Sequence, residues 1–317
     1  MTKAKLATAR PRSINPGSRL SQPLPASWAE CTKRGWEQVD IVLVSGDAYI
    51  DHPSFGIALI GRLLASHGYR VAILAQPRYD RLDDFLQFGR PRLFFGISAG
   101  NLDSIVANYS GNGKVRTEDA YSAGGNPWRS SERSRTNRYR PDRASLIYAN
   151  LARAAFKEVT IILGGVEASL RRFVHYDYQQ EKLRGSLLAD AKADLLIYGM
   201  GERAVVEAAA RLAAGLGLEA IKGSCERLTE AQLQLRFPDL PPAGSNSCSI
   251  LPSWQAIEAD QRLFMAAERL IDVHARGYLP TMLLQRQQSS WLLQHPAAAP
   301  LTTAELDQVY ELPYSRK

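Results

Sequence analysis

Two short stretches of this sequence gather side chains that can do chemistry. The first, GDAYIDHPSFG, contains the ionisable groups of Asp47, Asp51 and His52. Carboxylate and imidazole groups this close together can act as an acid–base pair or as metal ligands. Asp51 and His52 are adjacent, however, so they can hold a metal only with ligands from elsewhere in the chain.

The second stretch, GGVEASLRRFVHYDY, combines an acid, two arginines and a polar aromatic run. Glu167 stands at the start of an expected helix, where a carboxylate can simply complement the helix dipole. The residues after it are more polar than the end of a surface helix requires. We predict that they bind substrate: Arg171, Arg172, His175, Tyr176 and Asp177.

Common motifs of other enzyme classes are missing from the sequence. It has no G-x-x-x-x-G-K-[ST] loop, no G-x-G-x-x-G after its first apolar run, no H-E-x-x-H and no paired C-x-x-C. Its cysteines, Cys31, Cys225 and Cys248, are far apart and odd in number, which favours a reducing cytoplasm over a disulfide framework. No apolar run reaches the roughly 18 residues of a membrane helix, so we expect a cytoplasmic protein that does not contact a membrane.

The side chains of both stretches must be positioned by the surrounding elements. Apolar strand-like runs, which alternate with helical patterns, begin near residues 40, 69, 92, 159 and 193. This alternation predicts an α/β domain over residues 35–215, a three-layer structure with a mainly parallel sheet and helices on both faces. Ser54 is expected to cap the first long helix, and Gly56 to let that helix pack closely.

Ligands of such sheets bind where the carboxyl ends of the strands turn into helices. Here each of these turns combines small residues with acids or amides, although a tight turn needs glycine with or without a ligand. We therefore predict a pocket that binds a cofactor or substrate, and no metal site. Its residues would be Asp47, Asp51, His52, Ser54, Gly56, Gly100, Asn101, Gly164, Gly165, Glu167, Gly199, Gly201 and Glu202.

The segments that flank the domain carry weaker patterns. Residues 1–34 are expected to form a basic flexible arm. Residues 216–317 are expected to form a linker and an irregular helical extension. This extension includes one long helix, AIEADQRLFMAAERLIDVHARG, and a last helix capped by Thr302 or Thr303.

An arginine-rich loop, residues 111–140, interrupts the domain and contributes to the net charge of +7. Its stretch WRSSERSRTNRYRPDR, which runs on to Arg143, holds Arg129, Arg133, Arg135, Arg138, Arg140 and Arg143. The loop is either a solvated insertion or a clamp on phosphate or RNA, because its arginines alternate with Trp128 and Tyr139.

The first turn is similar to the D-x-H-x-x-G turn of cobalamin-binding α/β domains, in which the histidine ligates cobalt. When Gly56 is aligned with the glycine of that motif, Asp51 falls on its aspartate. Pro53 then occupies the ligand position, with His52 one place early. Proline has no ligating atom, so the fold is expected to be cobalamin-domain-like, or Rossmann-like, without histidine-ligated cobalamin.

Longer strings of the sequence resemble the amino-terminal portion of the YgiQ-type radical SAM proteins. They are RGWEQVDIVLVSGDAYIDHPSFGIALIGRLLASHGYRVAILAQP, LFFGISAGNLDS, RPDRASLIY, ILGGVEASLRRFVHYDY, ADLLIYGMGER and PLTTAELDQVYELPYSRK. The resemblance implies a catalytic half with a C-x-x-x-C-x-x-C triplet that binds a [4Fe–4S] cluster and S-adenosylmethionine. The 317 residues contain no such triplet. From the resemblance, we expect them to lead toward a barrel that they do not include.

Three hypotheses follow. The first is an accessory domain of a radical SAM iron–sulfur protein, not catalytic alone, that binds substrate or cofactor and whose partner is the catalytic half; such a chain is a gene fragment, half of a split gene or a relic. The second is a stand-alone enzyme that uses Asp51, His52, Glu167 and His175. The third is a nucleic-acid-binding accessory protein that acts through the arginine-rich loop.

Overall fold

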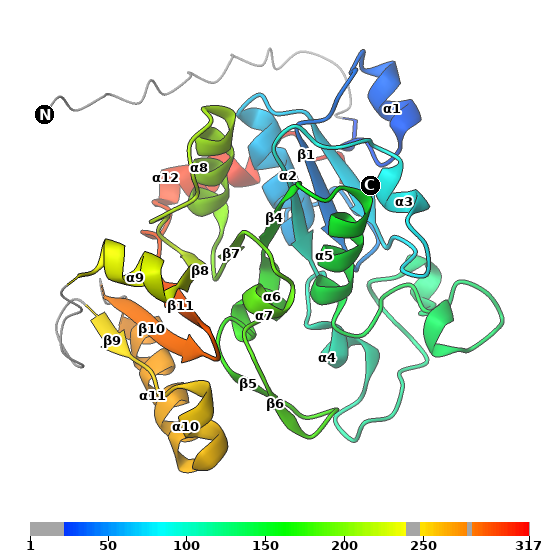
Figure 1. Ribbon diagram of the computed structural model, residues 1–317. Coiled ribbons are helices and arrows are strands. Elements are labelled where there is room, and N and C mark those ends of the chain that lie inside the picture. Colours follow the sequence, from blue (N-terminus) through cyan, green and yellow to red (C-terminus); the bar gives the residue numbers. More distant parts are fainter. Residues whose placement is uncertain (1–21, 239–247, 278–280, 317) are drawn as a thin grey trace, which may run out of the picture.

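A single mixed sheet of nine strands runs through the centre of the computed structural model, which describes residues 22–238, 248–277 and 281–316 (Figure 1). In order across the sheet, the strands are β2 (Val71–Ala75), β1 (Ile41–Ser45), β3 (Phe94–Ser98), β4 (Thr160–Leu163), β7 (Leu195–Ile197), β8 (Ser224–Thr229), β11 (Ser290–Gln294), β10 (Met282–Gln287) and β9 (Cys248–Ile250). A separate hairpin pairs β5 (His175–Asp177) with β6 (Lys182–Arg184).

The first five strands across the sheet are parallel, as the alternating pattern predicts. Their order places β1 between β2 and β3, so the connections that leave β1 and β3 diverge at this point of the sheet. All five residues of β1 are buried, because helices cover both faces of the sheet. The predicted fold class, a mainly parallel α/β sheet, is confirmed.

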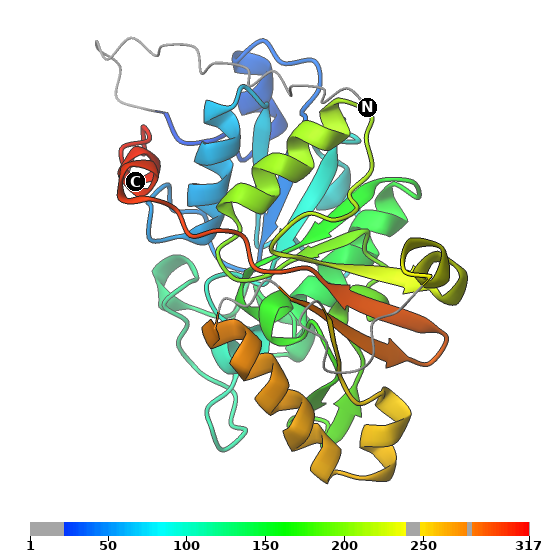
Figure 2. The same ribbon diagram turned by 90° about the vertical axis from the view of Figure 1, so that its left-hand side faces the viewer.

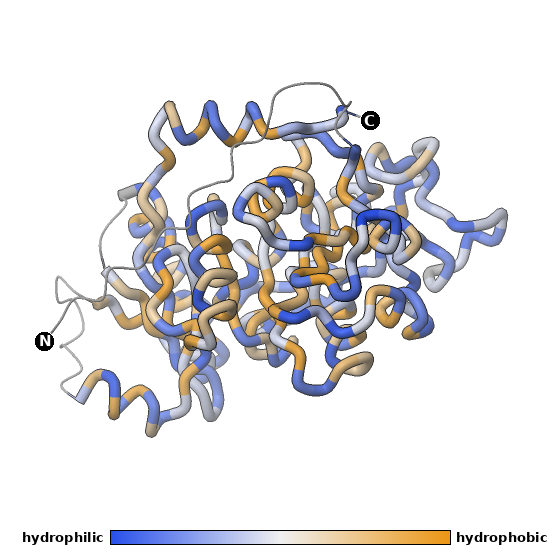
Figure 3. The backbone as a smooth tube through the Cα atoms, turned by 90° about the horizontal axis from the view of Figure 1, so that it is seen from above, coloured by the Kyte–Doolittle hydropathy of each residue, from blue (hydrophilic) through white to orange (hydrophobic). Residues whose placement is uncertain are grey.

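Two layers of helices enclose the parallel strands. On one face, α2 (Gly56–Ser66) and α8 (Glu202–Ala213) contact each other and bury their apolar sides against Ile41 and Leu43 (Figure 2). On the other face, α1 (Trp28–Lys33), α3 (Asp83–Leu86) and α5 (Ala144–Ala155) cover Val42 and Val44. Alternate residues of β1 therefore belong to two different cores. The hydropathy colours show the apolar segments gathered in the interior of the molecule (Figure 3).

Short elements crowd the carboxyl ends of the parallel strands. They are α4 (Ser104–Asn108), α6 (Gly165–Leu170) and the β5–β6 hairpin, whereas α7 (Leu187–Asp190) leads into β7 (Figure 1). The arginine-rich loop, which holds the short 3-10 turns η1 (Ala123–Gly125) and η2 (Arg135–Asn137), leaves the sheet at the same end.

The start of α2 differs from the prediction. Its N-cap residue is Phe55, and Ser54 makes no side-chain cap. Instead, the first helical N–H, that of Gly56, donates to Oδ1 of Asn101 at 3.4 Å. A Cβ added at Gly56 would meet open space, so this glycine is not required for close packing.

The larger difference lies beyond residue 215, where the structure adds strands β8 to β11 to the sheet in place of a linker and a purely helical extension. The helices of this part are α9 (Glu230–Arg236), α10 (Trp254–Ala259), α11 (Arg262–Gly277) and α12 (Thr303–Tyr310). The predicted long helix is thus two helices, and Thr302 caps the last one in a capping box with Glu305. Part of the predicted linker, residues 239–247, lies outside the described residues.

These strands escape prediction because they bury polar side chains. Oε1 of Gln285 accepts a hydrogen bond from the Val174 N–H at 3.0 Å, and Oε1 of Gln287 accepts one from the Ser186 N–H at 2.9 Å. Each buried amide therefore has a partner, yet the sequence shows no strongly apolar run.

The described part of the predicted basic arm, residues 22–34, is folded against the domain. Residues 1–21 lie outside the described residues. Within residues 22–34, however, α1 forms, and both Leu24 and Cys31 are buried in the core. Among the described helices, none is long and apolar enough to cross a membrane.

Candidate functional site

The carboxyl ends of β1 and β3, two of the four strand ends at which we predict the pocket, are filled by the protein's own side chains. Asp47 is 2% exposed, and its carboxylate accepts a hydrogen bond from the Asn101 N–H at 2.7 Å. Arg140, from the end of the arginine-rich loop, pairs with Asp47 at 2.5 Å and with Asp119 at 3.0 Å. Burial raises the pKa of Asp47, and the Arg140 guanidinium opposes this.

The glycines at this edge serve contacts between turns. Gly100 has φ +113°, and a Cβ there would lie 2.1 Å from the carboxylate of Asp47. At Gly165, φ is +82° and a Cβ would lie 2.6 Å from the hydroxyl of Ser98. Both positions therefore require glycine because neighbouring turns touch. Gly164 is the N-cap of α6.

Asp51 is fully buried and faces protein groups. Its carboxylate pairs with Arg62 and accepts hydrogen bonds from the Tyr49 hydroxyl at 3.1 Å and the Ser315 N–H at 2.8 Å. Burial alone would raise the pKa of Asp51, but the bonds from Arg62 and Ser315 hold it below its ordinary value. The half-buried His52 instead accepts from the Ser54 N–H at 3.1 Å through Nδ1.

Asp51 and His52 thus do not form an acid–base pair. They also do not fit the turn that ligates cobalamin, because Asp51 is committed to Arg62 and Pro53 has no donor atom.

Glu167 joins two helices. It is 1% exposed, and its carboxylate accepts hydrogen bonds from the Ser104 N–H and the Ser145 N–H, each at 2.9 Å, and from the Ser104 hydroxyl. Ser104 begins α4, and Ser145 lies in the first turn of α5, so the carboxylate lies at the positive ends of two helix dipoles. This arrangement accounts for Glu167 without a ligand.

The predicted substrate-binding residues separate in the structure. Arg171 pairs with Asp103 at 2.7 Å, and Asp177 accepts a hydrogen bond from Nε of Arg143 at 2.8 Å. Burial lowers the pKa of His175 to about 4, although its hydrogen bond to the Phe173 carbonyl opposes this. Tyr176 is exposed on the β5–β6 hairpin.

The four residues of the stand-alone enzyme hypothesis, Asp51, His52, Glu167 and His175, therefore do not converge on one point. Each has the separate surroundings described above.

Most arginines of the arginine-rich loop contact other groups of the protein. Arg129 lies 4.8 Å from the Tyr139 ring and donates to the Gln76 carbonyl, and the buried Arg138 lies 5.6 Å from the Trp128 ring. Arg140 and Arg143 form the ion pairs given above, and Arg133 is exposed. The side chain of Arg135 lies outside the described part of the chain. This arrangement does not favour a clamp on nucleic acid.

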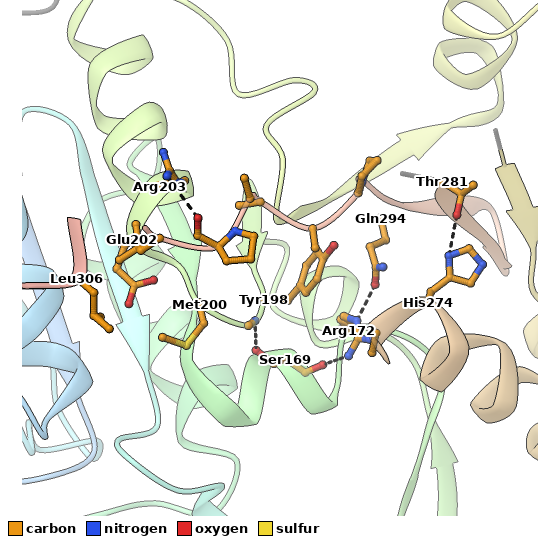
Figure 4. A pocket seen from close by; sticks show the side chains of 18 residues that line it. Ser169, Arg172, Tyr198, Met200, Glu202, Arg203, His274, Thr281, Gln294 and Leu306 are labelled. Atoms are coloured by element: carbon orange, nitrogen blue, oxygen red, sulfur yellow. Dashed lines mark hydrogen bonds between the residues drawn. The ribbon is translucent and has the colours of Figure 1, made fainter. Parts of the chain in front are cut away.

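A cavity of about 450 Å³ opens beside the carboxyl ends of β4 and β7 (Figure 4). It lies where the parallel strands meet the segment that follows β11 and the end of α11. Its walls are formed by Ser169, Arg172, Tyr198, Gly199, Met200, Glu202, Arg203, His274, Ala275, Thr281, Gln294, residues 296–300, Leu301 and Leu306.

Arg172, Gly199 and Glu202 are the predicted site residues that line this cavity. Gly199, with φ +65°, donates its N–H to the Ser169 hydroxyl at 3.1 Å, and Gly201 is the N-cap of α8. The α8 turn therefore places Glu202 at the cavity wall.

Arg172 is held firmly in place. Its Nε donates to Oε1 of Gln294 at 2.7 Å, and its guanidinium carbon lies 5.3 Å from the Tyr198 ring and 5.7 Å from the Phe173 ring. Burial lowers the pKa of His274, whose ring nitrogens contact the Thr281 hydroxyl at 2.9 Å and the Ser249 hydroxyl at 3.2 Å.

Sequence reasoning missed Tyr198, His274, Thr281, Gln294 and the segment after it. Tyr198 follows the apolar run of β7 directly, and this position could have marked it. Gln294 carried no signal, because its strand was not predicted.

The cysteines do not form a metal site. No group of three or more His, Cys, Asp or Glu side chains that could hold a metal ion occurs within residues 22–238, 248–277 and 281–316. All three thiols are buried, and burial raises the pKa of Cys31 to about 11, that of Cys225 to about 12 and that of Cys248 above its ordinary value. Because thiolates are the ligands of iron–sulfur clusters, these residues do not fit a [4Fe–4S] cluster.

A family model and several curated proteins match most of this chain. The model of a family described as Radical SAM N-terminal matches residues 23–317. A UPF0313 protein of Rhodopseudomonas palustris is 46% identical over 305 residues, which cover 92% of this chain and 44% of that protein. A UPF0313 protein of Thermotoga maritima is 42% identical over 294 residues, which cover 93% of this chain and 48% of that protein. The chain spans about half the length of the curated relatives that it matches.

Among solved structures, the radical S-adenosylmethionine methyltransferase TsrM of Kitasatospora setae is similar to part of the chain. Its structure with tryptophan substrate and a SAM analogue aligns with a TM-score of 0.39 and 15% identity, over 61% of this chain and 29% of that one. Its structure with cobalamin and a [4Fe–4S] cluster aligns with a TM-score of 0.36 and 16% identity, over the same shares of the two chains.

Proposed function

This chain belongs to the Radical SAM N-terminal family, and from that premise we propose that it is the ligand-binding half of a radical SAM protein. In this proposal, a catalytic half carrying the cysteine triplet binds the [4Fe–4S] cluster and S-adenosylmethionine, which together supply the radical. The present half binds a small molecule and holds it. We propose no radical step within these 317 residues, because their cysteines do not fit a cluster.

The cavity beside β4 and β7 carries this proposal. It lies outside the carboxyl ends of parallel strands, where ligands of such sheets bind. Its volume of about 450 Å³ lies within the range of small-molecule sites, about 300–1,000 Å³. Small-molecule sites typically have a mostly apolar wall with a few polar groups. In this cavity, Met200 and Leu306 are apolar lining residues, and Glu202 is a charged one.

The residues of the cavity have distinct tasks in this proposal. Arg172, fixed by Gln294 and between two rings, presents a rigid guanidinium to the ligand. Glu202 presents a carboxylate, and Met200, which is 73% exposed, lies at the cavity mouth and covers the apolar part of the ligand. The carboxyl ends of β1 and β3 have a structural role in this proposal, because Asp47 and Asp51 there form ion pairs with arginines.

The test is enrichment of a small molecule from a cell extract by equilibrium dialysis against the purified 317-residue chain. Ala297→Trp fills the cavity, which Ala297 lines, whereas Ala304→Trp places the same ring on the exposed surface of α12. We expect mass spectrometry to find a compound enriched by the wild type and by Ala304→Trp but not by Ala297→Trp. Equal enrichment by both variants, or enrichment by none of the three proteins, contradicts the proposal, provided that the melting temperatures agree.

A further inference from the structure

Glu202 is a mostly buried residue whose side chain lines the cavity. It is 6% exposed, and within the part of the chain that the structure describes it makes no ion pair and accepts no side-chain hydrogen bond. Buried carboxylates are normally paired with a cation or hydrogen-bonded. By comparison, Glu167 and Asp47 at the same edge of the sheet each have several partners. Glu202 therefore differs from these two carboxylates, because its charge remains available to a ligand in the cavity.

The neighbouring cation of the same helix does not provide that group. Arg203 pairs with Glu305 at 2.7 Å, and the same Nη2 lies 3.4 Å from the Pro300 carbonyl. It thus ties α8 to α12 along the rim. The start of α8 favours a negative charge at Glu202, but an exposed glutamate would gain the same benefit, so the helix dipole does not explain the burial.

The surroundings of Glu202 restrict what can reach it. Figure 4 shows its side chain between Leu306 and Met200, with Arg172 on the far side of Met200 and Tyr198. A cation that binds Glu202 therefore lies next to apolar side chains, and an apolar body attached to it would contact them. The guanidinium of Arg172 makes no ion pair among the described residues, and it disfavours a second positive charge at the other end.

We propose that the cavity selects a primary amine with an apolar body, whose single ammonium group binds Glu202. An ammonium group donates charge-assisted hydrogen bonds to a carboxylate, and it neutralises the buried charge. The inference rests on the proposed function, since it names the ligand class of the same cavity.

The test compares three probes of nearly the same shape: phenethylamine, 2-phenylethanol and 3-phenylpropionate. Isothermal titration of the 317-residue chain should show that the amine binds at least about tenfold more tightly than the alcohol or the acid, because a charged hydrogen bond is worth that factor. The preference should vanish in Glu202→Gln and persist in Glu207→Gln, which changes a more exposed glutamate of the same helix that is paired with Arg211.

Several results would overturn the inference: equal binding of amine and alcohol, tighter binding of the acid, no binding of the amine, or an amine preference that survives Glu202→Gln. Ala297→Trp separates this failure from that of the proposed function. If 2-phenylethanol binds the wild type and Ala297→Trp blocks it, the cavity is a binding site although the amine preference is absent. If the cell-extract experiment also shows no cavity-dependent enrichment, both proposals fail.

Discussion

At the scale of single residues, charged groups near the carboxyl ends of the strands divide into those with partners inside the protein and those without. Asp47, Asp51 and Glu167 all looked like site residues in the sequence, yet each is satisfied by an arginine or by backbone N–H groups. Glu202 looks no different in the sequence, and it is the one of these four that makes no such contact in the described structure. Residue type and position predicted where charge accumulates, but only the packing determines which charge remains free for a ligand.

Arg140 is the residue that closes the edge between β1 and β3. Its replacement by methionine in Arg140→Met leaves Asp47 and Asp119 buried without their cation, which typically costs about 3–5 kcal/mol. Urea denaturation at pH 7 measures this loss of unfolding free energy. Because burial already raises the pKa of Asp47, protonation of this carboxylate should relieve part of the loss when the pH is lowered.

Arg133→Met is the matched control, since Arg133 is an exposed arginine of the same loop, and it should change stability by no more than about 0.5 kcal/mol. A loss below about 1 kcal/mol in Arg140→Met would show that these ion pairs do not stabilise the fold.

At the scale of elements, predictability follows how strongly apolar each strand is. The runs of β1, β2, β3, β4 and β7 consist mainly of buried aliphatic and aromatic residues, and the sequence located all five. Strands β8, β10 and β11, beyond residue 215, contain Glu226, Gln285, Gln287 and Gln294, which are buried by pairing with groups distant in the sequence. No local pattern contains those partners, so this half of the sheet could not be derived from the sequence.

Glu226 of β8 makes the extension sensitive to acid. Burial by itself raises its pKa, but hydrogen bonds from His295 and from Arg236 at 2.6 Å lower it to about 2. The ordinary value in an unfolded chain is about 4.3. A carboxyl group with a lowered folded pKa contributes stability that is complete above about 4.3 and is lost as the pH falls toward 2.

The variant Glu226→Gln should therefore lose less unfolding free energy between pH 6 and pH 3 than the wild type does, by about 1–2 kcal/mol after allowance for the partly exposed Arg236. Urea midpoints at the two pH values test this. Glu258→Gln, on the exposed side of α10, should follow the wild-type pH dependence. If Glu226→Gln does the same, the buried cluster is not the source of the acid sensitivity.

At the scale of the whole molecule, the cavity exists because two parts of the chain meet. The turns after β4 and β7 come from the predicted α/β domain. The other walls, α11, the segment after β11 and α12, come from the part beyond residue 215, where the sequence predicted helices but no strands. The sequence motifs identified the family, which the comparisons confirm. They also predicted a pocket at the carboxyl edge of the sheet, which stays a prediction. They could not locate the cavity along that edge, since its far wall depends on strands with no recognisable pattern.

The last described residues are tied to the same edge through Asp51. Its side chain accepts the Ser315 N–H at 2.8 Å, its carbonyl accepts the Arg316 N–H at 2.9 Å, and its carboxylate also pairs with Arg62 of α2. One buried group thus connects the first turn of the sheet to a segment more than 260 residues away. Replacement by asparagine removes the charge that Arg62 faces and weakens the acceptor for Ser315.

We therefore expect Asp51→Asn to lower the unfolding free energy by about 3 kcal/mol, as for the loss of one member of a buried pair. We also expect it to speed amide exchange of Ser315 and Arg316 at least about tenfold, since a loss of about 1.4 kcal/mol in local protection suffices for that factor. Hydrogen exchange, resolved by NMR or mass spectrometry, measures both the global unfolding free energy and the local exchange of these two amides. Asp307→Asn, on the exposed side of α12, is the control. If the amides of Asp51→Asn instead exchange at the wild-type rate, residues 314–316 are held by the packing of Tyr314 and not by Asp51. The connection between the first turn of the sheet and the last described residues must then be assigned to that ring.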